Sequence, residues 1–161
     1  MDPILQYLQK DARMTPKELA RLTRSTADKV KKKIGQFEKQ GVIVGYKTVI
    51  NKELVKEKER RVRALIEVNV VPQKDLGFDK VAERIYRFPE VTSCYLLSGS
   101  YDLLLVVEGG DLHAVSRFVA EKLSPMENVR GTVTHFLLKK YKEDGILLKG
   151  KDEDRRLAIT Y

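Results

Sequence analysis

The sequence predicts an α+β protein with two parts, an N-terminal winged helix-turn-helix and a C-terminal ferredoxin-like βαββαβ domain. Two helix-start signals, at Thr15 and Ser25, lie ten residues apart, which suits two helices joined by a tight turn. Residues 62–141 then alternate between strand-like and helix-like periodicity in the order strand, helix, strand, strand, helix, strand.

The N-terminal part is predicted to hold three helices. Asp2-Pro3 can begin the first, with the carboxylate as cap and proline at the first helical position. Thr15–Glu18 adds a glutamate that can reach back to the cap, which is a capping box. Ser25 begins the same pattern again, and Gly41 ends that third helix. Residues 22–24 leave room only for a turn.

The third helix combines an apolar stripe with a dense group of lysines. Ala27, Val30, Ile34 and Phe37 recur at helical spacing, so they are predicted to be buried. The candidate DNA-binding residues at the turn and on the solvent side are Arg24, Ser25, Thr26, Lys29, Lys31, Lys32 and Lys33. A solvated helix face is the simpler interpretation of such a charge run. Gly35 does not fit, because glycine within a helix costs about 1 kcal/mol relative to alanine.

The charge of the chain is uneven. Residues 1–60 hold 15 Lys and Arg against 8 Asp and Glu, a net +7, whereas residues 61–161 are nearly neutral at +1. This asymmetry favours a polyanion-binding domain beside a neutral one. The β-branched run 42–50 predicts a small wing or hairpin. The highly charged residues 51–61 are predicted to form a linker or a solvated helix between domains 1–50 and 62–141.

The second domain is predicted to contain four strands and two helices. The predicted strands are 62–70, 91–97, 101–107 and 131–141, and the predicted helices are 76–88 and 112 to about 123. Two helices on one face would leave the other sheet face bare, which favours a second copy of the chain as its cover. The extension 142–161 carries a hairpin signal at 143–145 and possible short strands at 146–148 and 157–161.

Residue types that carry catalysis or bind metals are not grouped in the sequence. Cys94 is the only cysteine, and His113 and His135 fall in different predicted elements, so no zinc site is indicated. The chain has neither a phosphate-binding loop nor a Gly-x-Gly-x-x-Gly motif. We therefore expect no cofactor, no metal and no enzymatic activity.

Membrane and RNA partners are disfavoured on separate grounds. The N-terminus lacks a basic stretch followed by an apolar run, and the longest aliphatic run, Leu103–Val107, is far shorter than the ~20 residues of a membrane helix. A single cysteine fits a reducing compartment, so a cytoplasmic location is expected. Some ferredoxin-like domains bind RNA through aromatic residues on a central strand, but Arg130-Gly131 is followed by Thr132-Val133.

The turn Ser98–Asp102 is the remaining chemical candidate. Glycine permits close backbone approach, two hydroxyls and free backbone N–H groups can hold a carboxylate, and Asp102 can hold an ammonium group. These features together suit a free amino acid. A plain hairpin turn stabilised by an aspartate explains the same residues. The candidate effector-binding residues are Ser98, Gly99, Ser100, Tyr101, Asp102 and Thr134.

Two phrases of the sequence resemble a known family. Phe37–Tyr46, FEKQGVIVGY, is similar to the Leu-Glu-x-x-Gly-Val-Ile-x-Gly-Tyr exit of the Lrp/AsnC (feast/famine) transcriptional regulators, and Leu19-Ala20 matches their first motif helix. Gly99–Leu104 is similar to their Gly-x-Tyr/Phe-Asp-Tyr/Leu turn. The resemblance covers about residues 2–140. It implies sheet-domain dimers, often octamers, with amino-acid effectors bound between subunits near residues 99–102.

The chain departs from the family pattern at Gly35, where a larger and often basic residue is usual, and at Thr23–Ser25, which replaces Gly-Leu-Ser. The main functional hypothesis is a sequence-specific, double-stranded-DNA-binding transcriptional regulator that responds to an amino acid. Ser25, Thr26 and Lys29 would face base edges or phosphates, and the other basic residues mostly phosphates. The alternative is a non-specific DNA-compacting protein with a metabolite-sensing or assembly domain.

Overall fold

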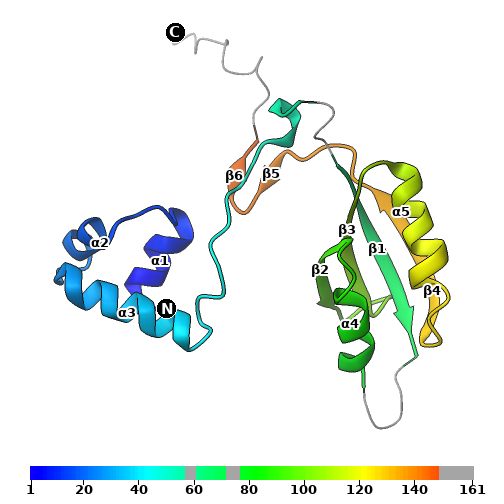
Figure 1. The fold of residues 1–161 in the computed structure, drawn as a ribbon, viewed down its shortest axis with the longest axis horizontal. Coiled ribbons are helices and arrows are strands. Elements are labelled where there is room, and N and C mark those ends of the chain that lie inside the picture. Colours follow the sequence, from blue (N-terminus) through cyan, green and yellow to red (C-terminus); the bar gives the residue numbers. More distant parts are fainter. Residues whose placement is uncertain (57–60, 72–76, 149–161) are drawn as a thin grey trace. The chain divides into compact units, whose positions relative to one another are not determined.

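The computed structural model describes residues 1–56, 61–71 and 77–148. The chain separates into two compact units, Met1–Ile50 and Asn51–Tyr161, and each is described here by itself (Figure 1). The predicted helix start at residue 76 and the predicted strand at 157–161 lie outside the described residues.

The first unit consists of α1 (Pro3–Lys10), α2 (Pro16–Leu22) and α3 (Ala27–Lys39). Local capping explains where two of them begin. The Asp2 carboxylate accepts from the backbone N–H of Ile4 at 2.9 Å. The capping box of α2 is confirmed, since Thr15 accepts from the Glu18 N–H and the Glu18 carboxylate accepts from the Thr15 N–H at 2.7 Å.

The predicted capping box at Ser25 is wrong. Thr26 caps α3 instead, and its hydroxyl accepts from the Lys29 N–H at 3.4 Å. The third helical residue is therefore Lys29, whose side chain has no acceptor with which to return a bond to the cap. One of the two expected bonds forms, and the helix starts one residue later than the pattern indicated.

A small core joins the three helices. Ile4, Leu19, Ala20 and Val30 are buried. The partly buried side chains packed around them are Tyr7, Leu8, Met14 and Ile34. The predicted apolar stripe of α3 is confirmed, with Val30 at its centre and the other three members partly buried. The opposite side of α3 is thereby left to solvent.

The predicted hairpin over residues 42–50 is not formed. Gly41, at a φ of 69°, turns the chain out of α3, and the N–H groups of Val42 and Ile43 both donate to the Phe37 carbonyl. Residues 44–50 carry neither helix nor strand. A strand needs a partner for its backbone groups, and the β-branched run has none among the described residues. The Tyr46 hydroxyl instead donates to Glu38 of α3 at 2.9 Å.

The second unit is built on a four-stranded antiparallel sheet in the order β2-β3-β1-β4. The strands are β1 (Val62–Val70), β2 (Val91–Leu96), β3 (Leu103–Gly109) and β4 (Val129–Phe136). The helices are α4 (Asp79–Tyr86) and α5 (Leu112–Phe118), the latter continued by a π-helical turn at Val119–Leu123. The βαββαβ order is confirmed. The last strand begins and ends earlier than predicted, at 129 and 136.

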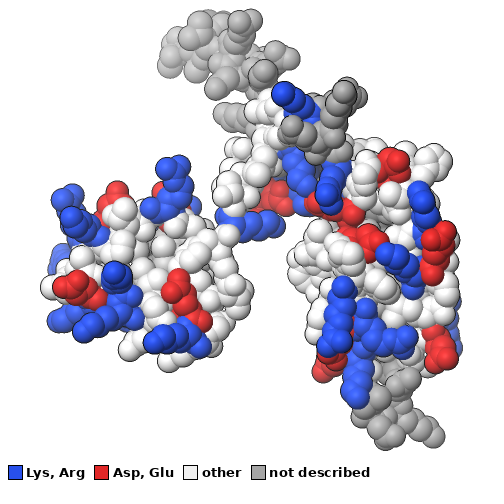
Figure 2. All heavy atoms as spheres, viewed as in Figure 1, with Lys and Arg blue, Asp and Glu red and all other residues white. Residues whose placement is uncertain are grey.

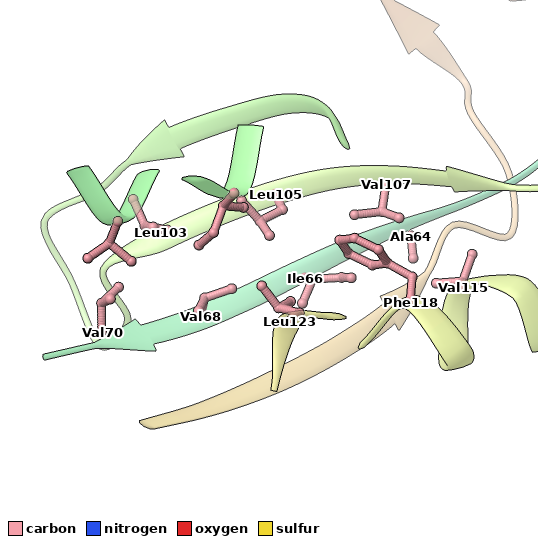
Figure 3. Packing of buried hydrophobic residues seen from close by; sticks show 12 residues of the cluster. Ala64, Ile66, Val68, Val70, Leu103, Leu105, Val107, Val115, Phe118 and Leu123 are labelled. Carbon is pink, nitrogen blue, oxygen red and sulfur yellow. The ribbon is translucent and has the colours of Figure 1, made fainter. Parts of the chain in front are cut away.

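Both helices cover the same face of this sheet. Alternate residues of β1, such as Ala64, Ile66 and Val68, lie beside Leu103, Leu105 and Val107 of β3, and all six are fully buried. Figure 3 shows these side chains together with Val115 and Phe118 of α5 and Leu123 of the turn that follows. Val70 of β1 and Val81 and Ile85 of α4 complete the cluster. Burial of each such side chain contributes roughly 1.5–3 kcal/mol.

The opposite sheet face, called here the uncovered sheet face, carries no helix from the described residues of this unit. Register pairs Leu65 with Val106 and Glu67 with Leu104, and these residues point away from the helices. Tyr95 and Val133, on the outer strands of this face, are 51% and 49% exposed. An apolar sheet face of this kind needs a partner to be removed from water.

A short hairpin follows the sheet. Its strands are β5 (Lys142–Glu143) and β6 (Ile146–Leu147), joined by Asp144 and Gly145 at φ values of 48° and 83°. Positive φ at both central residues is the type I′ geometry, which confirms the predicted turn. The possible strand at 146–148 is confirmed for its first two residues.

Candidate functional site

The turn between α2 and α3 is held by backbone bonds to α2. The Thr23 N–H and hydroxyl both donate to the Leu19 carbonyl, at 2.9 and 2.7 Å, and the Ser25 N–H donates to the Ala20 carbonyl at 2.9 Å. Arg24 adopts a φ of 50°, a left-handed conformation that is unfavourable for a residue with a side chain. These bonds fix where α3 begins, and Arg24, Ser25 and Thr26 are exposed to solvent there.

The lysines of α3 divide between two sides of the helix. Lys31 and Lys32 line a shallow groove on the solvent side, and its other lining residues are Asp28, Gly35, Gln36 and Lys39. Lys29 and Lys33 line a second hollow on the side toward α1, together with Asp2 and Ser25. The seven predicted DNA-binding residues thus lie in one unit, and the four lysines among them face two sides of α3.

Lys33 already has partners within the protein. Its ammonium group lies 2.5 Å from an Asp2 carboxylate oxygen and 6.0 Å from the centre of the Phe37 ring. The hydrogen bond from Lys33 lowers the pKa of Asp2, against the opposing effect of partial burial. This arrangement ties the start of α1 to the middle of α3.

Two further residues of the groove escaped prediction. Gln36 and Lys39 follow Lys32 at spacings of four and seven, so they occupy the same side of α3. The three consecutive lysines drew the prediction to the run itself. Helical spacing from Lys32 would have found both residues, because it is the spacing that decides which side chains share a face.

Charge on this unit is strongly positive. Residues 1–50 hold 11 Lys and Arg against five Asp and Glu, a net +6. Figure 2 shows blue side chains around the visible face of the unit, with fewer red ones among them. Such a balance attracts a polyanion, and a capped, solvent-facing helix of 13 residues is the right size to enter a DNA groove.

The turn predicted to bind an effector connects β2 to β3. The Leu97 N–H donates to the Asp102 carbonyl at 2.9 Å, and the Asp102 N–H donates to the Val68 carbonyl at 3.1 Å. The Asp102 side chain also accepts from the Val70 N–H at 2.7 Å. Asp102 therefore fastens the end of β1 to this turn with one of its oxygens, while Ser98, Gly99 and Ser100 are exposed.

Thr134 does not join this turn within one chain. It lies in β4 opposite Ile66, on the helix-covered side of the sheet. The strand order places β1 between β4 and β3, so Thr134 and the β2–β3 turn are on different strands that are not neighbours. Tyr101 and Asp102 are partly buried at the turn itself.

The remaining candidates carry no visible chemistry in the described part of the chain. Burial raises the pKa of the Cys94 thiol, which is the opposite of what activates a nucleophile. His135 lies 3.1 Å from Glu67 on the uncovered sheet face, and His113 is exposed on α5. No group of three or more His, Cys, Asp or Glu in residues 1–56, 61–71 and 77–148 is placed to hold a metal ion. No helix in those ranges has the length and apolar character to cross a membrane.

Comparison with known families accounts for both units. Residues 4–44 match the winged helix-turn-helix DNA-binding model, and residues 63–147 match the Lrp/AsnC ligand binding domain. The HTH-type transcriptional regulator YugG of Bacillus subtilis is 43% identical over 157 residues, which are 98% of this chain and 94% of YugG.

Solved structures show the same architecture. Transcriptional regulator NMB0573 of Neisseria meningitidis, in complex with L-methionine, is 30% identical with a TM-score of 0.69, covering 88% of this chain and 89% of NMB0573. A feast or famine regulatory protein of Mycobacterium tuberculosis, complexed with L-methionine, is 25% identical with a TM-score of 0.69, covering 91% and 95%. The two family models that match this chain, together with its 43% identity to YugG, establish that it belongs to the Lrp/AsnC family of transcriptional regulators.

Proposed function

We propose that this regulator binds specific DNA sites as a homodimer or a larger assembly in the cytoplasm, and that a free amino acid modulates the binding. The observation that carries the proposal is α3, a capped helix whose solvent side holds Lys31, Lys32, Gln36 and Lys39 in a unit of net charge +6. A helix of this kind presents donors to a DNA groove, and its cations neutralise phosphates.

Residues at the front of α3 read or position the DNA in this proposal. Ser25, Thr26 and Lys29 precede or begin the helix and face base edges or nearby phosphates. Arg24, Lys31 and Lys32 contact phosphates, and Lys39 joins them because it shares the groove. Gln36 lies in the same groove and faces the base edges. Lys33 contributes through its ion pair with Asp2, which holds α3 against α1.

The uncovered sheet face supports pairing of two chains. Leu65, Leu104, Val106 and Val133 present an apolar surface that a second copy would bury. Two recognition helices related by a two-fold axis would bind a near-palindrome with half-sites about 34 Å apart, or a multiple of that distance. Pairing therefore couples the sheet domain to the choice of DNA site.

The amino-acid effector is proposed to bind at the Ser98–Asp102 turn. Two relatives of similar fold are described in complex with L-methionine, which supports an amino acid as the class of ligand. The exposed hydroxyls of Ser98 and Ser100 suit the carboxylate. The Asp102 carboxylate has a second oxygen besides the one that accepts from Val70, and this oxygen suits the ammonium group.

The test of DNA recognition is footprinting on a pool of genomic fragments. Protection of defined sites is expected, since Ser25, Thr26, Lys29 and Gln36 face base edges. Even coverage of all sequences at equal affinity would instead support the DNA-compacting alternative.

The test of the effector site is calorimetry with L-methionine and the other amino acids. Asp102→Asn keeps an acceptor for the Val70 N–H but removes the negative charge. We expect the variant to keep its fold by circular dichroism and to lose at least about tenfold in affinity, the scale of one charge-assisted hydrogen bond. Absence of wild-type binding at millimolar amino acid would contradict the effector proposal, as would unchanged affinity in Asp102→Asn.

A further inference from the structure

Gly35 lies on the solvent side of α3, inside the groove. Its neighbours on the helix surface, at spacings of three and four, are Lys31, Lys32 and Lys39. A Cβ built at Gly35 would meet no side chain, and no backbone beyond the adjacent turns of α3, within 4 Å, and its backbone is ordinary right-handed helix. Among the described residues, neither packing nor backbone conformation therefore calls for glycine at this position.

Glycine at this position weakens the helix that the proposed function depends on. Among the residues other than proline, it is the poorest helix former, because it loses the most backbone freedom on folding. Gly109 offers a contrast, since a Cβ there would lie 2.9 Å from a Val115 methyl group and the close packing of α5 on β3 explains it. At Gly35, by contrast, the space left by the missing side chain is open to a binding partner of α3.

We infer that Gly35 is a specificity-determining position that sets how deeply α3 enters the DNA major groove. The inference rests on the proposed DNA-binding function and extends it. Without a side chain at the middle of its exposed face, the helix backbone can approach the base edges closely. The side chains beside Gly35 then reach further into the groove than they could from a helix held away by a Cβ.

The residues beside Gly35 suit the two tasks that such an approach requires. The Gln36 amide can bond two atoms of an adenine edge. Lys31, Lys32 and Lys39 surround the bare position and can hold phosphates on either side of the groove. Base contacts distinguish sequences and phosphate contacts do not, so a change at Gly35 should affect the two kinds of binding differently.

The experiment compares the full-length wild type with Gly35→Ala and with Gly45→Ala as a matched control. Gly45 is an exposed glycine outside helix and strand, and a Cβ there also meets nothing within 4 Å. Two duplexes are used, one selected by the wild type from a random pool and one with the same composition scrambled. Affinity is measured for both at several salt concentrations, and thermal unfolding of each protein is followed by circular dichroism at the helix band.

We expect Gly35→Ala to unfold at a higher temperature than the wild type yet bind the selected duplex about tenfold more weakly, the scale of one lost base contact. Its affinity for the scrambled duplex and its salt dependence should be unchanged, and Gly45→Ala should match the wild type in DNA binding. Equal or tighter binding of the selected duplex by Gly35→Ala would overturn the inference. An equal loss on both duplexes would overturn it as well, because it would mark a phosphate contact. Failure of the wild type to prefer any duplex would count against the proposed function itself.

Discussion

Lys32 and Lys33 are neighbours in the sequence but have different surroundings. Lys32 faces the open groove with Gln36, whereas Lys33 is paired with Asp2 and lies over the Phe37 ring. A rotation of 100° per residue along the helix separates them. In the sequence the run is a single basic patch, because Asp2 lies 31 residues from Lys33 and only the packing of α1 on α3 brings the two close.

At this scale, Lys32→Ala and Lys33→Ala should have separable effects. Lys32→Ala should weaken DNA binding and reduce the slope of log affinity against log salt by about 0.9, the value of one phosphate contact. Lys33→Ala should leave that slope unchanged and lower the free energy of unfolding by about 0.2–1 kcal/mol, as expected for a partly exposed ion pair. Salt titrations and urea unfolding of both variants measure the two quantities. A reduced slope in Lys33→Ala would contradict this assignment.

Among the elements, those with strong periodicity were predictable and those that depend on distant partners were not. The alternation of β1 and the capped starts of α1, α2 and α5 are encoded in a few consecutive residues, and each was found. Residues 42–50 have β-branched composition, but a hairpin also needs a partner strand that nothing in this unit supplies. The turn at Ser98–Asp102 is predictable from its local sequence. The hydrogen bond from the Val70 N–H to the Asp102 carboxylate is not, because it joins residues 32 apart.

One further element-scale feature is an ion-pair cluster that joins the hairpin to the sheet. Arg63 of β1 donates to Glu108 of β3 and, at 3.2 Å, to Glu143 of β5. The Lys52 ammonium group lies 2.9 Å from the same carboxylate oxygen of Glu108. Burial alone would raise the pKa of Glu108, but the hydrogen bonds from Lys52 and Arg63 outweigh it and lower the pKa below the usual 4.5. Hydrogen bonds from Lys140 and Arg63 likewise lower the pKa of Glu143.

The cluster predicts how stability depends on pH. A carboxylate with a lowered folded-state pKa stabilises the fold above the unfolded value, and the contribution is lost as pH falls through the folded pKa. Glu108→Gln should therefore destabilise the sheet domain by about 1–3 kcal/mol at pH 7. The difference from the wild type should shrink as pH falls below about 4.5, the ordinary pKa of the group. Denaturant unfolding at pH 7 and at pH 3 measures both, and a difference as large at pH 3 as at pH 7 would exclude this mechanism.

For the whole molecule, the uncovered sheet face is the feature that supports the proposed pairing of chains. The bare face was predictable, because a βαββαβ sheet with both helices on one side leaves the other side apolar and open. Leu104 lies at its centre, opposite Glu67. What covers that face depends on how chains assemble. The sequence supports only the proposal that a second chain covers it.

Pairing predicts the behaviour of Leu104→Lys. The new ammonium group can pair with Glu67 in the monomer, so the domain should stay folded, but burial of that charge between two sheets is unfavourable. Sedimentation should show Leu104→Lys as a monomer under conditions in which the wild type forms the proposed oligomer. The affinity of the variant for a near-palindrome should fall toward its affinity for a single half-site. Leu112→Lys, at an exposed position on α5 away from this face, is the matched control and should remain oligomeric. An unchanged oligomer in Leu104→Lys would place the interface elsewhere.

Residues 47–50 carry neither helix nor strand, and they follow Tyr46, whose hydroxyl bonds to α3. Four residues span at most about 14 Å when fully extended, so this segment adds little reach to the unit that holds α3. In the proposed pair of chains, once one α3 is bound to DNA, the local concentration of the other is high only at half-sites within its reach. The length of this segment therefore affects the choice of DNA site: lengthening it should widen the range of half-site spacings that the paired protein accepts, and shortening it should narrow that range.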